Sequence, residues 1–166
     1  MIIGLSVGAF TTLHVIISII GLLAGVLAVA AMLADKRPGL ETGVFLCFTI
    51  LTSATGFLFH SAKIGPPHIV GVLSLIVLAV ACAALYGFKL KGAWRTVYVV
   101  TALLALWFNA FVAVVQAFDK IAALKALAPT GSEPPFLVAQ IVVLAVFVAL
   151  GVMATKRFHP MLAQPA

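Results

Sequence analysis

Charged residues are scarce in this chain. They make up 8% of its 166 residues, against about 25% in soluble domains. Hydrophobic residues make up 64%, and the mean hydropathy is +1.29. So few charges cannot cover a water-facing surface, which excludes a soluble globular domain and a disordered chain. The composition predicts an integral membrane protein whose main partner is the lipid bilayer.

Cysteines and acidic residues are also few. The two cysteines, Cys47 and Cys82, lie inside apolar runs without CxxC spacing, which excludes a disulfide framework and a zinc ribbon. Proton-coupled transporters usually keep a carboxylate near the middle of the membrane. Here all the acidic residues lie in predicted loops, which argues against that class: Asp35, Glu41, Asp119 and Glu133.

Catalytic motifs are missing as well. The chain has no HExxH, no GxSxG and no phosphate-binding loop. This argues against an enzyme, and we assign no catalytic residue. The net charge of +6 does not indicate nucleic-acid binding, because the basic residues fall in short loops between apolar runs.

Five uncharged apolar runs are long enough to cross a bilayer, which needs about 20 residues. Each is too long for a strand, and a helix satisfies its own backbone hydrogen bonds in lipid. We therefore expect an all-α fold, a single transmembrane domain over residues 1–166 that forms a bundle of five transmembrane helices. The expected spans are residues 10–34, 43–62, 68–88, 96–118 and 136–155.

The longest connection, residues 119–135, carries apolar residues at helical spacing beside Lys120 and Lys125. This pattern predicts a short interfacial helix between the fourth and fifth spans. Ser132 is placed to cap the fifth helix, with Pro134 and Pro135 in its first turn.

The basic residues divide unequally between the two sides of this bundle. With five spans, seven Lys and Arg residues fall on the side of the first loop, the third loop and the carboxyl tail, and three fall on the other side. Lys and Arg favour the cytoplasmic side. The sequence thus predicts an amino terminus outside and a carboxyl terminus in the cytoplasm.

Small residues indicate which face of a membrane helix is packed. On the first helix, Gly21 and Gly25 form a GxxxG pair, and Gly4 and Gly8 form a second. Such pairs either pack the bundle internally or contact a neighbouring protein, and the sequence leaves both open.

Polar residues concentrate near the outer ends of the spans. A ligand site opening to the outside would use five of them: His14, His60, His68, Gln116 and Gln140. Imidazole ligates haem iron, copper and zinc. The histidines could hold a haem b or a metal ion, and His with Gln could bind a quinone or lipid headgroup. Alternatively, these side chains are interfacial or join helices.

Three segments resemble a family of small multi-pass bacterial inner-membrane proteins with no assigned activity: TSATGFLFH (52–60), NAFVAVVQAF (109–118) and LAPTGSEPPF (127–136). The resemblance implies a bacterial inner membrane. It adds no catalytic residue and no cofactor.

The many small-residue faces and the few polar groups in mid-membrane favour a non-catalytic function. We expect an accessory, assembly or scaffold component of a membrane complex, or a homo-oligomer. Two alternatives stay open. One is a haem-, metal- or quinone-binding protein with an outward-facing histidine site. The other is a channel or passive transporter subunit with Asn109 near the middle of its path.

Overall fold

A computed structural model describes residues 1–59 and 65–160. Over these residues the chain is helical and has no strand. The elements are α1 (Val7–Leu33), α2 (Leu40–Gly56), α3 (Pro66–Cys82), the π-helical turn η1 (Ala83–Gly87), α4 (Trp94–Lys120), α5 (Ala122–Leu127) and α6 (Pro134–Arg157).

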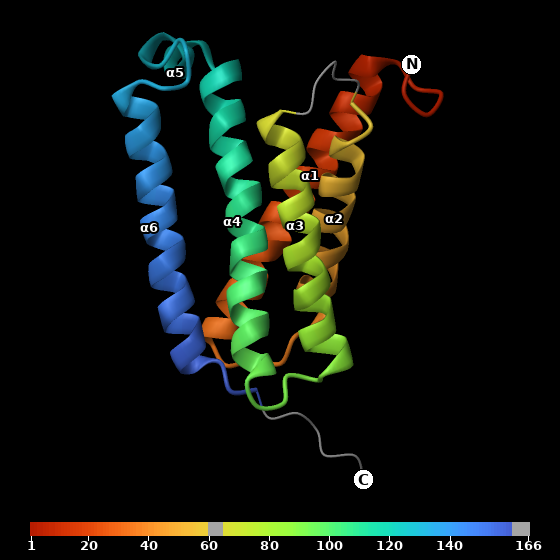
Figure 1. Ribbon diagram of the computed structural model, residues 1–166, viewed down its shortest axis with the longest axis vertical. Coiled ribbons are helices and arrows are strands. Elements are labelled where there is room, and N and C mark those ends of the chain that lie inside the picture. Colours follow the sequence, from red (N-terminus) through yellow and green to blue (C-terminus); the bar gives the residue numbers. More distant parts are fainter. Residues whose placement is uncertain (60–64, 161–166) are drawn as a thin grey trace.

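The long helices lie side by side and alternate in direction (Figure 1). The chain begins at the upper end of this view, and α6 finishes at the lower end. Helix α2 packs against α1 and α3, whereas α6 packs mainly against α4 and α1. The short α5 lies at the upper end, in the connection between α4 and α6.

Four helical segments among the described residues are long and apolar enough to cross a membrane: Val7–Leu33, Pro67–Gly87, Trp94–Lys120 and Pro134–Arg157. They correspond to four of the five predicted spans. The span predicted at residues 43–62 corresponds to α2, which has 17 residues and ends at Gly56. At 1.5 Å per residue α2 is about 25 Å long, short of the ~30 Å hydrocarbon core. The structure therefore does not by itself establish the fifth crossing.

The starts of α1, α3 and α6 show features typical of helix N-termini, whereas the described starts of α2 and α4 have no side-chain cap hydrogen bond. The Ser6 hydroxyl accepts a hydrogen bond from the Ala9 amide at the start of α1. Prolines occupy the first turn of α3 and of α6, where a missing amide proton costs little. The expectation that Ser132 caps α6 is wrong, because the N-cap is Glu133.

The buried core lies nearer the lower end of the bundle. Its largest fully buried side chains include Tyr98, Phe45, Phe158 and Leu78. By contrast, α4 between residues 107 and 117 has no buried residue. The helices are thus held together most firmly around the amino-terminal half of α4.

The Gly21/Gly25 pair packs inside the bundle. A Cβ on Gly25 would lie 2.4 Å from a Leu106 methyl and 2.8 Å from the Phe45 ring, and one on Gly21 would lie 3.3 Å from the backbone of α2. A side chain at Gly25 would therefore require Leu106 and Phe45 to shift, and one at Gly21 would fit only tightly against α2. No neighbour lies within 4 Å of a Cβ built on Gly8.

Candidate functional site

His14 and His68 lie near the same end of the bundle, and each packs against an aromatic residue of segment 57–59. The His14 ring packs edge-on against Phe59 at 5.2 Å between ring centroids, and Phe10 contacts Phe59 at 5.0 Å. The His68 ring lies 6.0 Å from that of Phe57. The aromatic residues that follow α2 thus connect the two histidines.

The His14 ring is oriented by a threonine. Its Nδ1 lies 2.8 Å from the Thr55 hydroxyl oxygen, which in turn lies 2.6 Å from the Leu51 carbonyl oxygen. The imidazole tautomer determines which of the two groups donates in this hydrogen bond, and either direction holds the ring against α2. Thr55 is a site residue that sequence analysis missed. The only feature of the sequence that could have indicated Thr55 is its position three residues after Thr52.

His68 lies in the first turn of α3. Its Nδ1 accepts a hydrogen bond from the Gly65 amide at 3.3 Å. Beside it is an open hollow of about 490 Å³. The described residues that line the hollow are mostly apolar: Met1, Ile2, Ile3, Phe57, Leu58, Phe59 and His68.

The proposed three-histidine site stays a prediction. His60 lies outside the described residues, so its position relative to His14 and His68 is not tested. Within residues 1–59 and 65–160, no group of three or more His, Cys, Asp or Glu side chains could hold a metal ion. At one end of the molecule the structure places two imidazole rings, those of His14 and His68.

The two glutamines predicted for this site have different environments. Gln116 is exposed on α4. Gln140 is partly buried, and its amide nitrogen donates to the Phe111 carbonyl oxygen at 3.2 Å, which joins α6 to α4. In its observed contact Gln140 thus acts as a helix-to-helix link. Neither glutamine has a described contact with His14 or His68.

Most hydroxyl groups in the long helices are satisfied within their own helix. Each donates to the carbonyl oxygen four residues earlier, as seen for Thr11, Ser18, Thr52, Thr101 and Thr155. These groups need no water or partner helix to satisfy them in lipid. An exception is Ser53, whose hydroxyl donates to that of buried Ser74 at 3.0 Å and links α2 to α3.

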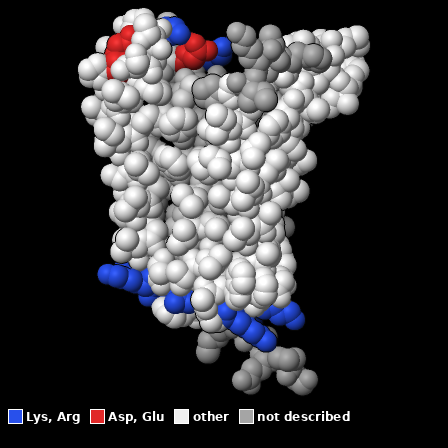
Figure 2. All heavy atoms as spheres, in the orientation of Figure 1, with Lys and Arg blue, Asp and Glu red and all other residues white. Residues whose placement is uncertain are grey.

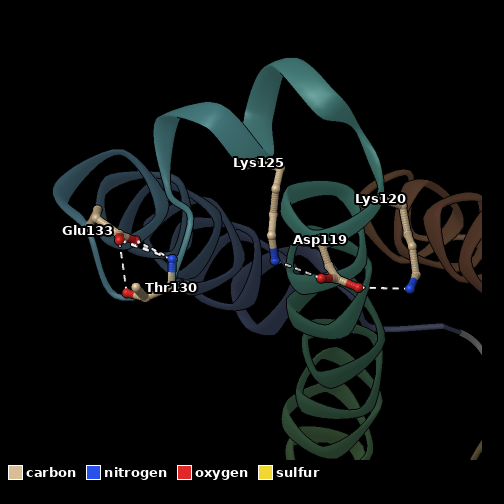
Figure 3. A network of polar contacts seen from close by, with 5 residues as sticks. All are labelled: Asp119, Lys120, Lys125, Thr130 and Glu133. Carbon is tan, nitrogen blue, oxygen red and sulfur yellow. Dashed lines mark hydrogen bonds and ion pairs between the residues drawn. The ribbon is translucent and has the colours of Figure 1, made fainter.

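Two carboxylates, those of Asp119 and Glu133, stabilise the connection around α5 (Figure 3). Asp119 pairs with Lys120 at 2.8 Å and with Lys125 at 2.9 Å. Glu133 accepts hydrogen bonds from the Thr130 amide and hydroxyl and from the Ser132 amide. Desolvation opposes ionisation of Glu133, but these bonds outweigh it and lower its pKa to about 2. The carboxylate therefore stays charged and closes the turn before α6.

A second set of contacts holds the carboxyl end of α6 at the lower end of the bundle. The Arg95 guanidinium donates to the carbonyl oxygens of Thr155 and Phe158. Asp35, in the first loop, accepts from the His159 amide at 2.6 Å. Phe158 is 1% exposed and packs near Tyr98. We name these contacts of Arg95, Asp35, Phe158 and His159 the C-terminal clasp. Sequence analysis gave no sign of it.

The charges lie at the two ends of the molecule and leave an uncharged middle (Figure 2). Among the described residues, the lower end carries seven Lys and Arg residues with Asp35 and Glu41, and the upper end carries the cluster around Asp119 with Glu133. The comparisons with protein-family models, curated proteins and solved structures give no match to this chain. The suggested family resemblance therefore stays a prediction.

Proposed function

We propose that the chain is a non-catalytic membrane component that packs through α6 against other membrane helices, either in a larger complex or in a homo-oligomer. The uneven burial of its apolar helices supports this. In the most apolar 18-residue window, 33% of α1, 22% of Pro67–Gly87 and 33% of α4 are buried, against 0% of α6.

The surface that α6 leaves open is continuous and apolar. Ile141 is 64% exposed, Val148 is 58% exposed and Val138 is 57% exposed. Helix α6 is attached along one side, chiefly to α4, so most of its circumference meets lipid or another helix. Packing against a second helix in lipid depends on close surface fit rather than on hydrophobicity. Rigid β-branched side chains such as these lose little freedom on packing.

The same proposal includes a fifth membrane crossing by α2 and the identity of the membrane. Helix α2 runs beside α1 and α3 and is followed by the apolar residues Phe57–Phe59, which extend its reach. An α2 that returns the chain across the bilayer accounts for the alternating directions in Figure 1. Helix α5 then lies at the outer interface. The excess of Lys and Arg at the opposite end faces the cytoplasm, which suits a bacterial inner membrane.

Labelling of single cysteines tests this topology. With Cys47 and Cys82 replaced by serine, we expect Lys91→Cys to react only from the cytoplasmic side. Lys125→Cys should react with a membrane-impermeant maleimide added to intact spheroplasts. Lys36→Cys, which α2 and α3 separate from Lys91, should react from the same side as Lys91→Cys if α2 crosses the bilayer. One crossing, that of α4, separates Lys91 from Lys125. Labelling of Lys91→Cys and Lys125→Cys from the same side, or of Lys36→Cys and Lys91→Cys from opposite sides, would contradict the five-span arrangement.

Cross-linking through α6 tests the packing. In the same cysteine-free background, Ile141→Cys in native membranes should form a disulfide-linked pair at twice the 17.3 kDa of one chain. A bifunctional maleimide should give an adduct with a distinct partner protein if the complex is heteromeric. Leu27→Cys, which is 61% exposed on α1, is the matched control.

Three results would contradict this proposal. The first is equal cross-linking at Ile141 and Leu27. The second is no adduct at Ile141. The third is a strictly monomeric species by native mass measurement in mild detergent.

A further inference from the structure

The lower end of the bundle carries cations that nothing in the described chain neutralises. Both ion pairs found in residues 1–59 and 65–160 involve Asp119, at the other end. The carboxylates near the cations are already engaged with backbone amides: Asp35 accepts from His159, and Glu41 accepts from Gly39. Six exposed cations therefore lack a carboxylate within 4.0 Å in the described part of the chain: Lys36, Arg37, Lys89, Lys91, Lys156 and Arg157.

The loop between η1 and α4 holds two of these cations in place. Between them, Leu90 is 5% exposed, belongs to the core and donates its amide to the Ala84 carbonyl oxygen at 3.0 Å. Lys89 and Leu90 have φ values of 49° and 57°, a left-handed conformation that turns the chain sharply. Lys89 and Lys91, on either side of this anchor, are both exposed. The two ammonium groups are thus attached to a fixed backbone rather than to a loose loop.

Aromatic residues lie on both sides of the two lysines in the sequence. Phe88 and Trp94 stack with their ring centroids 3.7 Å apart and their planes 1° from parallel. Tyr86 is 61% exposed. Aromatic side chains of this kind sit at the level of lipid headgroups, where an apolar ring meets acyl chains and a polar edge meets water. Cations on a fixed loop, within a few residues of such aromatic side chains, form a surface that suits a lipid with a charged headgroup.

We propose that Lys89 and Lys91 bind the phosphate of an anionic phospholipid in the leaflet at this end, with Trp94 beside its acyl chains. The inference rests on the proposed membrane placement. A zwitterionic lipid carries its own cation beside the phosphate, so it gains less from the two lysines. Each basic residue near an anionic membrane surface favours binding about fivefold, and salt screens the effect.

Quenching of Trp94 fluorescence tests the proposal. The chain has two tryptophans, and Trp107→Phe leaves Trp94 as the sole one. The Trp107 ring nitrogen has no hydrogen-bond partner among the described residues, so this change removes no observed bond. The full-length protein is reconstituted with brominated phosphatidylglycerol or with brominated phosphatidylcholine. We expect the anionic lipid to occupy the position beside Trp94 about fivefold or more in preference to the zwitterionic one.

Two matched double variants isolate the lysines. Lys89→Gln with Lys91→Gln should reduce the preference severalfold, and 1 M salt, which also screens the other cations at this end, should reduce it to near one. Lys120→Gln with Lys125→Gln removes the same charge from the other end and should leave the preference unchanged. Equal quenching by both lipids in the Lys89/Lys91 wild-type loop would overturn the inference while leaving the membrane placement intact. Quenching by neither lipid would instead contradict the membrane placement.

Discussion

Gly25→Leu should destabilise the folded protein substantially. A Cβ at this position lies 2.4 Å from a Leu106 methyl and 2.8 Å from the Phe45 ring, so even a methyl group requires both neighbours to move. A leucine would push against Leu106 on α4 and Phe45 on α2. Overpacking of this kind typically costs about 1–3 kcal/mol. We expect a lower midpoint of unfolding in a dodecyl sulfate titration and a loss of monodisperse protein.

Gly8→Leu is the control for this experiment. It lies on the same helix and has the same change in composition, but no atom lies within 4 Å of its added Cβ. Its free energy of unfolding should match that of the wild type within a few tenths of a kcal/mol. An equal loss of stability in both variants would show that packing at Gly25 does not decide the result.

Arg95→Leu should release the carboxyl end of α6. The guanidinium donates to the carbonyl oxygens of Thr155 and Phe158, which lie at a helix terminus where carbonyl groups lack intrahelical partners. A hydrogen bond from a charged group contributes about 1.5–3 kcal/mol. Local opening should therefore become about 10- to 100-fold more frequent, and chymotryptic cleavage after Phe158 should accelerate by a similar factor.

Lys156→Leu removes a neighbouring positive charge that makes no hydrogen bond or ion pair in the described part of the chain. Its cleavage rate should stay close to that of the wild type. If Lys156→Leu accelerates cleavage as much as Arg95→Leu does, the C-terminal clasp depends on net charge and not on the Arg95 hydrogen bonds.

The helical class and the approximate limits of most helices follow from the sequence alone. Uncharged apolar runs become helices in lipid because no other backbone arrangement satisfies their hydrogen bonds. The predicted spans at 10–34 and 136–155 agree with α1 and α6 to within three residues. The asymmetry of charge is also a property of the sequence, and Figure 2 shows it at the two ends of the molecule.

The sequence could not predict which side of each helix faces its neighbours. In a soluble helix the apolar stripe indicates the buried face. In these helices nearly every side is apolar, so the pattern carries little information about rotation. Gln116 and Gln140 have similar polarity and similar predicted depth, yet Gln116 is exposed and Gln140 joins two helices.

Steric fit between distant segments determines the contacts that the sequence could not predict. Gly25 contacts Leu106 on α4 and Phe45 on α2 because only a residue without a side chain leaves room for them. The C-terminal clasp joins Arg95 to Phe158, and Asp35 to His159, across separations of 63 and 124 residues. Lys89 and Lys91 share a fixed loop because Leu90 is buried among residues of other helices. Local sequence sets the chemistry of each side chain, whereas these pairings depend on how the packed helices bring distant residues into contact.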